Sequence, residues 1–446
     1  MNFVIIGADA AGMSAASRAK RKKRDMRVVV VEKTFDVSYS ACGMPYNIAD
    51  RNRDMEELVV RRAEVFREKQ GIELYNGYEA KRIDKRNKKV WGINHEGKEF
   101  EFSYDKLLIA TGAKAIRPDI PGNRDNGVFT LKNLEDGRRI KSYLEEKQVK
   151  EVVIIGMGYI ALEMSEALVK RNIRVKMIKP NAIFLPWMDR ELSERVKEVL
   201  KREGVELFPG HPIESIGRKG EKLVVRAPDM NLEGEMVLIA IGVRPNSELA
   251  KDAGLSLSIK DSISIHRDFT TSDNHIYAAG DCADTYNIIT QEKTYVPLAL
   301  LANRGGWMVA DNVTGENKEF PGIVGTSVFK VFDLQVARTG LTQKEAKRAG
   351  FDPISITIHT RSRAHAHPGA KKISVHLIAD KKSKRLLGAQ MVGEEGVAHR
   401  INAIAVALHN QMTVYDYSLC DLAYAPPFGP VWDPTLVAAN QLLKRL

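Results

Sequence analysis

Cysteine is scarce in this chain of 446 residues, which contains only three. Cys42, Cys282 and Cys420 lie far apart, and none belongs to a Cys-x-x-Cys pair. This spacing argues against a disulfide scaffold and a zinc site, so we expect no metal and assign any sulfur chemistry to a single thiol. A signal peptide and a membrane-spanning apolar run are also missing, because "MNFVIIGADAAG" begins directly with a predicted strand. We therefore expect a cytoplasmic protein with no membrane partner.

Aromatic residues are also few, at 7% of the chain, and they do not alternate with basic residues. The 68 Lys and Arg outnumber the 57 Asp and Glu and give a net charge of +11. Much of this excess is local, since "SRAKRKKRD" has six basic residues between Arg18 and Arg24. Such a run is either a solvated helix end or a surface that binds phosphate groups. Without interleaved aromatics we expect no nucleic-acid partner, and a phosphate-rich small molecule is the alternative ligand.

Two segments have the strand, glycine turn and helix pattern of dinucleotide-binding units. The first is "FVIIGADAAGMSAASRAK", in which Gly7, Ala8 and Gly12 form the turn and the next predicted strand ends at Glu32. Here the helix N-terminus faces a pyrophosphate, and an acid at the end of the second strand binds ribose hydroxyls. The middle glycine of the usual fingerprint is replaced by Asp9.

The second unit is "VVIIGMGYIALEMSEALVKRNIRVKMIK", in which Gly156 and Gly158 fit the same fingerprint. Its second predicted strand ends in Lys179, where an acid would repel a 2'-phosphate and a lysine attracts it. Lys179 therefore either favours NADPH over NADH or is an exposed lysine without a role. Two such units in one chain indicate that two dinucleotides meet.

Three further stretches support this interpretation by their order along the chain. "LLIATGA" places Thr111 and Gly112 after a predicted strand, "IYAAGDCA" places Asp281 after another, and "VPLALLANRGG" opens a predicted helix at Pro297.

The whole chain resembles the pyridine nucleotide-disulfide oxidoreductase superfamily, and "SYSACGMPY" and "DLAYAPPFGPVWDP" resemble its single-cysteine branch. That branch contains coenzyme A-disulfide reductases, NADH oxidases and peroxidases, and NAD(P)H persulfide reductases. The resemblance implies an α/β fold with two Rossmann-like dinucleotide-binding domains and a C-terminal α+β dimerisation domain. It implies an FAD-binding domain at 1–112 and 245–320, an NAD(P)H-binding domain at 113–244 and a dimerisation domain at 321–446.

The resemblance also implies which residues bind the two cofactors, FAD and either NADPH or NADH. The expected FAD-binding residues are Gly7, Ala8, Gly12, Glu32, Thr111, Gly112, Asp281, Pro297 and Ala299. The expected NAD(P)H-binding residues are Gly156, Gly158, Tyr159, Ile160, Lys179 and Gly242.

Cys42 matches the redox-active cysteine beside the flavin. Relatives that carry an internal disulfide have a second cysteine five residues on, and this chain has Asn47 there, so the partner of Cys42 is a small molecule or an oxygen on its sulfur. Oxidase and peroxidase members have a histidine in the first glycine turn, where this chain has Ala10. We therefore expect reduction of coenzyme A disulfide or of coenzyme A persulfide or polysulfide, with an NADH oxidase as the alternative. A helix beginning near Pro45 is expected to favour the thiolate.

Two residues are candidates for protonating the departing thiolate in a homodimer whose active site is shared between subunits. Tyr424 matches the tyrosine that this branch contributes from the neighbouring subunit. His367 lies in "HAHPGA", where coenzyme A-disulfide reductases have "YYPG", and it is either a proton donor or a packed interface histidine.

The basic residues near the first turn are candidates for binding the phosphates of coenzyme A. Ser14, Arg18 and Arg21 fall on one face of the predicted helix, and arginine suits phosphate because its fork donates two parallel hydrogen bonds. The expected substrate-binding set is completed by Ser38, Arg61, Arg62 and Arg67.

Overall fold

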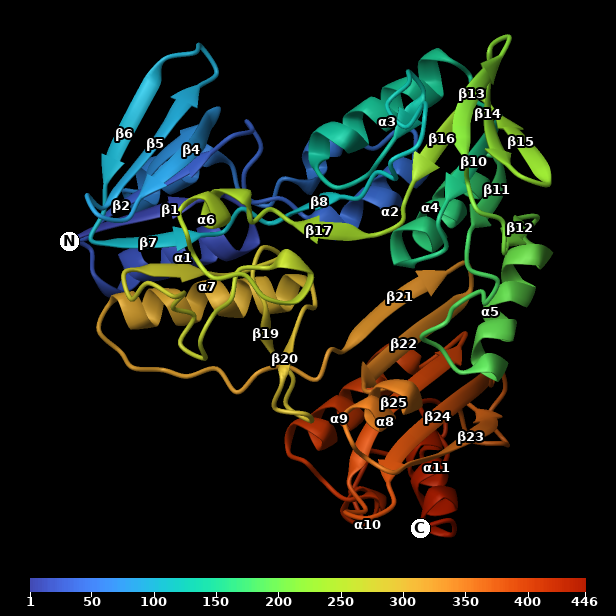
Figure 1. Ribbon diagram of the computed structural model, residues 1–446. Helices are drawn as coiled ribbons and strands as arrows, with labels where there is room; N and C mark the ends of the chain where they lie inside the picture. Colours follow the sequence, from blue (N-terminus) through green and yellow to red (C-terminus); the bar gives the residue numbers. More distant parts are fainter.

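The computed structural model describes residues 1–446 and has three lobes (Figure 1). The first lobe combines the N-terminal segment with a later segment that returns to it. The second is inserted between these two segments, and the third is formed by the C-terminal segment. None of the helices has the length and apolarity needed to cross a membrane.

The first lobe is built on a parallel five-stranded sheet with the order β18-β7-β1-β2-β3. Its strands, apart from the edge strand β3, are apolar and buried on both faces, as expected for a parallel sheet covered on each side. These strands are β1 (Asn2–Ile6), β2 (Arg27–Glu32), β3 (Glu73–Asn76), β7 (Lys106–Ile109) and β18 (Ile276–Ala278).

Two helices pack on one another against this sheet, and a small antiparallel sheet adjoins it (Figure 1). The helices are α1 (Ala10–Lys22) and α7 (Ala299–Val313). The antiparallel strands are β4 (Tyr78–Asp84), β5 (Lys89–Asn94) and β6 (Glu99–Ser103). Because β18 and α7 come from the returning segment, the core of this lobe is discontinuous in sequence.

The inserted lobe repeats the parallel arrangement, with the strand order β12-β11-β10-β16-β9. These strands are β9 (Val128–Phe129), β10 (Glu151–Ile155), β11 (Arg174–Lys179), β12 (Glu206–Pro209) and β16 (Met236–Ile239). Its helices are α3 (Leu134–Glu146), α4 (Tyr159–Lys170) and α5 (Arg190–Arg202). Its antiparallel sheet contains β13 (Ser215–Lys219), β14 (Lys222–Ala227) and β15 (Met230–Gly234).

The chain crosses between these two lobes twice, and the crossings pair as antiparallel strands. They are β8 (Ala113–Ala115) and β17 (Val243–Pro245). The segment "IRPDIPGNRDNG" that follows β8 has no regular structure, which agrees with its interpretation as a linker.

The third lobe has an antiparallel sheet with the order β21-β22-β25-β24-β23, as the alternating pattern of its sequence predicts. The strands are β21 (Ser327–Val331), β22 (Leu334–Gly340), β23 (Pro353–Arg361), β24 (Lys372–Asp380) and β25 (Leu386–Gly393). The helices are α8 (Gln343–Arg348), α9 (Val397–His409), α10 (Val414–Ser418) and α11 (Pro434–Leu443).

Short elements complete the fold. They are α2 (Met44–Ala49), α6 (Glu248–Asp252), β19 (Thr285–Tyr286), β20 (Lys293–Thr294), the single 3₁₀ turns Ala41–Gly43, Met55–Leu58 and Ile259–Asp261, and a π-helical turn at Val65–Lys69. The two-lobed α/β arrangement with a third α+β lobe confirms the predicted fold class.

Candidate active site

The first glycine turn joins β1 to α1 and is closed by hydrogen bonds from two directions. The Gly7 N–H donates to Val31 O at 2.8 Å, and the Ala8 N–H donates to Glu32 Oε2 at 2.9 Å. Gly7 has φ +109°, and a Cβ there would lie 2.2 Å from Ala110 O. The turn therefore requires glycine at this position. Glu32 Oε1 also accepts from Thr34, so both oxygens of this carboxylate stabilise the turn.

The second glycine turn has the same backbone. The Gly156 N–H donates to Ile178 O at 2.8 Å, its φ is +119°, and a Cβ there would lie 2.2 Å from Ala240 O. A Cβ on Gly158 would meet no atom within 4 Å. This open position before the N-terminus of α4 fits a dinucleotide pyrophosphate, which uses the free N–H groups there.

Lys179 ends β11, as predicted, but its ammonium donates to the carbonyls of Ile183 at 2.7 Å and Phe184 at 2.9 Å. Burial lowers the pKa of this lysine. The following loop therefore engages the ammonium, and the attraction of a 2'-phosphate by Lys179 stays a prediction. Any contact of Lys179 with a 2'-phosphate competes with these two hydrogen bonds.

The remaining predicted cofactor residues lie at the ends of neighbouring elements. Thr111 Oγ1 donates to Asn246 O at 2.6 Å, which joins the two segments of the first lobe. Asp281 Oδ2 forms an ion pair with Lys132 Nζ at 3.0 Å. Pro297 and Ala299 flank the beginning of α7, as predicted. Gly112 and Gly242 adjoin the paired crossings β8 and β17, and Tyr159 and Ile160 form the first turn of α4.

Cys42 lies in the 3₁₀ turn that leads directly into α2, and its side chain is exposed. Cys282 is fully buried and Cys420 is partly buried, so Cys42 is the only cysteine with an open thiol. The helix predicted near Pro45 is confirmed, and it begins one residue earlier.

Four charged groups from separate segments act on the Cys42 thiol. Desolvation raises its pKa, the Glu163 carboxylate raises it further, and Lys132 lowers it. Asp281 and Asp9 add smaller upward effects. Desolvation, together with the surrounding carboxylates, therefore outweighs the thiolate stabilisation expected from the helix. The same set of neighbours shows that the first glycine turn, the Asp281 segment and α4 all converge on Cys42.

Two of these neighbours were missed by the sequence analysis. Glu163 of α4 accepts a hydrogen bond from the Tyr46 hydroxyl of α2 at 2.8 Å, and burial raises the pKa of this carboxyl group. Glu163 comes four residues after Tyr159 in "GYIALE", so helical spacing alone places it on the same face of α4 as that predicted residue. Lys132 has no comparable signal, since only the fold brings it to Asp281.

Asp9 occupies the middle position of the first turn and is also the N-cap residue of α1. Its carboxylate accepts from the Tyr39 N–H at 3.3 Å. Burial raises the pKa of Asp9 to about 6, and the charges of Glu32 and Asp281 contribute to this increase.

The predicted substrate-binding residues do not form one continuous surface. Arg18 forms a two-pronged ion pair with the buried Asp311 at 2.5 and 2.9 Å. Arg67 donates to Leu74 O at 2.9 Å and Asn76 Oδ1 at 2.5 Å, which ties it to β3. Ser14 Oγ donates to Asn303 Oδ1 at 2.6 Å.

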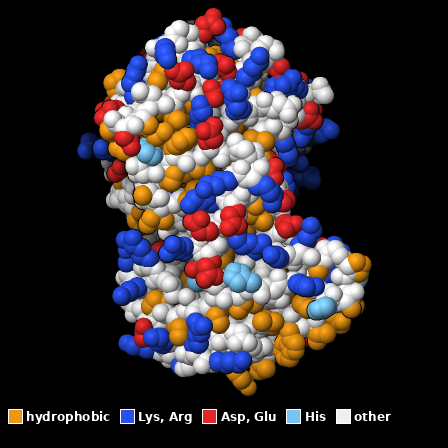
Figure 2. Space-filling view, turned by 90° about the vertical axis from the view of Figure 1, so that its right-hand side faces the viewer, with side chains coloured by type: hydrophobic (Ala, Val, Ile, Leu, Met, Phe, Trp, Pro, Cys, Tyr) orange, Lys and Arg blue, Asp and Glu red, His pale blue; other side chains and the backbone are white.

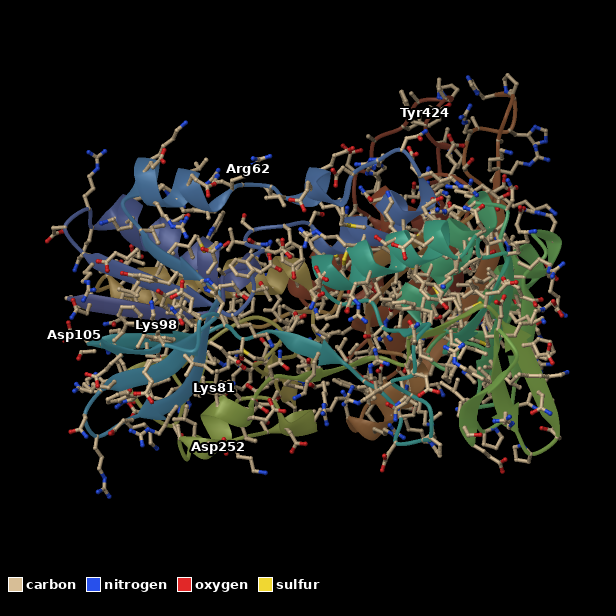
Figure 3. The ribbon with its side chains drawn as sticks, turned by 90° about the horizontal axis from the view of Figure 1, so that it is seen from above. Arg62, Lys81, Lys98, Asp105, Asp252 and Tyr424 are labelled. Atoms are coloured by element: carbon tan, nitrogen blue, oxygen red, sulfur yellow. The ribbon has the colours of Figure 1, made fainter.

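The other members of this set are more open. Arg21, Arg61 and Arg62 are exposed and form no ion pair, and Figure 3 shows Arg62 at the edge of the first lobe. Ser38 has φ +49°, and its N–H donates to Ala8 O at 2.9 Å, so it lies beside the first turn.

Tyr424 and His367 lie on neighbouring exposed loops of the third lobe. The Ala364 N–H donates to Pro426 O at 3.2 Å, and one Arg400 nitrogen donates to Ser362 O at 3.0 Å and Phe428 O at 2.9 Å. These bonds connect the two loops. Figure 3 shows Tyr424 and Arg62 at the same edge of the molecule but on different lobes.

The third lobe also exposes an unusual number of apolar side chains, which gather on its lower part in Figure 2. Its most exposed large apolar residues are Phe428 (78%), Leu419 (67%), Val431 (65%), Val406 (61%), Tyr415 and Trp432 (both 59%). Clusters of exposed apolar residues are typical of interaction surfaces.

Two family models match the chain. The one described as pyridine nucleotide-disulphide oxidoreductase matches residues 1–310. The one described as its dimerisation domain matches residues 326–434.

The chain is also similar to individual proteins over nearly its whole length. It is 37% identical over 441 residues to an NAD(P)H coenzyme A polysulfide/persulfide reductase of Pyrococcus horikoshii, covering 98% of both chains. It is 33% identical over 447 residues to an NADH oxidase of Methanocaldococcus jannaschii, covering 100% of this chain and 99% of the other. Among solved structures, an NAD-dependent persulfide reductase from A. fulgidus superposes with a TM-score of 0.96 at 36% identity, covering 100% of this chain and 83% of that one.

Proposed function

Because the chain belongs to the pyridine nucleotide-disulphide oxidoreductases, we propose that it is a cytoplasmic enzyme that reduces coenzyme A disulfide or coenzyme A persulfide or polysulfide at Cys42. It is an oxidoreductase that uses FAD and NAD(P)H. In this proposal FAD binds the domain at 1–112 and 245–320, NAD(P)H binds the domain at 113–244, and residues 321–446 form the dimerisation domain.

One observation carries the proposal. Cys42 is the only exposed cysteine, and both the first turn, through Asp9, and α4 of the second unit, through Glu163, lie close enough to influence it electrostatically. A single thiol between two dinucleotide units suits two-electron chemistry on a sulfur substrate, with no second cysteine to form an internal disulfide.

The proposed reaction begins when the Cys42 thiolate attacks one sulfur of the substrate disulfide. A Cys42–S–S–CoA bond forms, the substrate S–S bond breaks, and the other half leaves as a thiolate. With a persulfide substrate the leaving group is hydrosulfide. Cleavage of the mixed disulfide then requires two electrons, which bound FAD supplies from NAD(P)H.

The residues around the thiol have separate roles in this reaction. Desolvation and the Glu163 carboxylate raise the pKa of Cys42, so the thiol has to lose its proton before it attacks the substrate. The Tyr46–Glu163 hydrogen bond fixes that carboxylate against α2. Departing thiolates need a proton, and we assign its delivery to Tyr424 of the partner subunit, with His367 on the adjoining loop as a second donor.

The exposed basic residues near the first turn are proposed to bind the phosphates of coenzyme A. Arg21, Arg61 and Arg62 have no ion-pair partner, so their guanidinium groups are free to do so. Arg18 contributes only if a phosphate displaces or joins Asp311.

Replacement of Cys42 by serine tests the central step. In Cys42→Ser, coenzyme A disulfide reduction should fall by about two orders of magnitude or more, because a hydroxyl forms no mixed disulfide. Bound FAD, measured by absorbance, and its rapid reduction by NAD(P)H should be unchanged. Cys420→Ser is the matched control, since its partly exposed thiol lies in the third lobe. Undiminished turnover in Cys42→Ser would exclude the mechanism.

An NADH oxidase is the second candidate, because a relative with that name is 33% identical. Ala10 argues against it, since this turn lacks the histidine that the oxidase resemblance implies. An oxygen electrode distinguishes the two: an oxidase consumes oxygen at the rate at which it oxidises NADH, whereas a coenzyme A-disulfide reductase oxidises NADH rapidly only when the disulfide is present and consumes little oxygen in doing so.

The shared active site is tested with mixed dimers. If Tyr424 serves the partner's Cys42, a dimer of one Cys42→Ser chain and one Tyr424→Phe chain has one doubly altered site and one intact site. It should regain about half of the wild-type activity per dimer. If Tyr424 serves its own chain, both sites carry one alteration and no activity returns.

A further inference from the structure

A cavity of about 390 Å³ lies between the linker after β8 and the edge of the sheet in the inserted lobe. Arg117 and Arg124 of the linker and Arg139 of α3 line it. The remaining lining residues are Asp125, Asn126, Gly127, Val128 and Phe129. Figure 1 shows α3 in the upper part of this lobe, away from the third lobe. None of these residues takes part in the proposed reaction.

The three arginines form no ion pair within the protein, and Asp125 is the one acidic residue that lines the cavity with them. None of them has a carboxylate oxygen within 4.0 Å, whereas the adjacent Arg138 pairs with Asp36 and Glu56. Burial lowers the pKa of Arg117, and the positive charges of Arg124 and Arg139 lower it further, against an opposing effect of Asp136. The cavity therefore concentrates positive charge that an anion would stabilise.

Two of the three arginines, Arg117 and Arg139, are also held in place. Arg117 donates to the carbonyl of Asn123, and the Arg139 guanidinium lies over the Phe129 ring at 5.8 Å from its centroid. A fourth arginine, Arg218, donates to the carbonyl of Asn126. The N–H groups of Asn126 and Gly127, two of the lining residues, donate to no acceptor in the protein.

We propose that this cavity binds a small molecule with two or more adjacent phosphate groups. Three arginine side chains, each able to donate two parallel hydrogen bonds, can bind several phosphate groups at once. The cavity volume lies within the range of about 300–1,000 Å³ typical of small-molecule sites. A bare polyphosphate and a nucleoside polyphosphate share this chemistry. Because Arg117 and Arg124 belong to the linker and Arg139 to α3, an occupant ties the linker to the inserted lobe.

This site is separate from the second glycine turn. In the sheet, β16 and β10 lie between β9 and β11, so at a strand spacing of about 4.8 Å the cavity edge is roughly 14 Å from the strand that ends at Lys179. In addition, Asn126 and Gly127 precede β9, whereas the second turn follows the carboxyl end of β10.

Calorimetric titration of the FAD-loaded enzyme with inorganic tripolyphosphate, in saturating NADP⁺, tests the proposal. We expect one site per chain with a micromolar Kd, and at least tenfold weaker binding to a variant with Arg117, Arg124 and Arg139 replaced by glutamine. A matched variant with glutamine at the exposed, unpaired Arg86, Arg190 and Arg348 should bind as the wild type does. The FAD content and Tm of both variants establish that they fold.

Parallel titrations with ATP identify the source of the phosphates. Tighter binding of ATP than of tripolyphosphate indicates a nucleotide occupant, and equal binding indicates a polyphosphate. Three results would overturn the proposal: no binding in saturating NADP⁺, undiminished binding in the cavity variant, or equal loss in the matched variant.

Discussion

The two glycine turns of this chain share one backbone and differ in the side chains around it. Gly7 and Gly156 have nearly the same φ, the same 2.8 Å bond to the neighbouring strand and the same 2.2 Å approach to a carbonyl. The middle position is Asp9 in the first turn and Gly158 in the second, and the second strands end in Glu32 and Lys179. The backbone thus provides a general dinucleotide cradle, and the substituted positions adapt each cradle to its own ligand.

The largest expected effect on cofactor binding comes from replacing the first glycine, which both turns share. Alanine at Gly7 or Gly156 places a Cβ 2.2 Å from a carbonyl oxygen at a positive φ, so the turn must open. Gly7→Ala should be purified largely without FAD and with a Tm lowered by several degrees. Gly156→Ala should retain FAD and bind NAD(P)H at least tenfold more weakly. Flavin absorbance and coenzyme titration measure both.

Gly97→Ala is the control for backbone strain alone. Gly97 has φ +80°, but a Cβ there would meet no atom within 4 Å. We expect a loss of about 1 kcal/mol in the free energy of unfolding and no change in either cofactor. If Gly7→Ala behaved like this control, the close approach to Ala110 would have no part in binding FAD.

The second-largest expected effect concerns the side chain of Asp9, which has no counterpart in the second turn. Its pKa is raised from 3.8 to about 6, so the neutral form is favoured in the folded protein. The contribution of Asp9 to the free energy of unfolding is therefore fully present below pH 3.8 and is lost as the pH rises through about 6. A negative carboxylate beside a pyrophosphate is also unfavourable. We therefore expect wild-type affinity for FAD to fall by about tenfold between about pH 5 and pH 8.

Asp9→Asn should remove most of this pH dependence, and its apoprotein should unfold at a higher temperature than wild type at about pH 8 but not at about pH 4. Fluorescence quenching of added FAD measures the affinity, and thermal scans of the apoprotein measure the stability. An unchanged pH profile in Asp9→Asn would show that other groups cause it.

Both glycine turns, the position of Cys42 and the strands of the third lobe could be predicted because each depends on local pattern. A glycine between a buried strand and a helix is typical of a dinucleotide-binding turn, and the alternation in "KISVHLIAD" predicts a strand. These features lie in the structure where they were predicted.

Side-chain partnerships were not predictable in the same way. Arg18 lies on the expected face of α1, yet Asp311, which takes its guanidinium, is 293 residues away. Lys132 reaches Asp281 across 149 residues. Such pairs depend on how α1 packs on α7 and how the two lobes meet, and no local pattern encodes either. The direction of the pKa shift at Cys42 was not predictable for the same reason, because the desolvation of the thiol depends on packing and Glu163 belongs to the other lobe.

The smallest effect concerns the strand ends, Glu32 and Lys179. With its ammonium bonded to Ile183 and Phe184, Lys179 offers a 2'-phosphate only a contact that replaces existing hydrogen bonds. Partly exposed charge contacts contribute up to about 1 kcal/mol, or several-fold in affinity. We expect NADPH to be accepted with a modest preference over NADH.

Lys179→Glu should reverse this preference, because a carboxylate repels the 2'-phosphate and accepts from ribose hydroxyls as acids at this position do. Lys179→Met should bring the two coenzymes close to equality, which separates attraction by the lysine from repulsion by the acid. The ratio of kcat/KM values for NADPH and NADH measures each case. If Lys179→Met left the wild-type ratio unchanged, the loop would retain the ammonium throughout, and the coenzyme preference would be set by other residues.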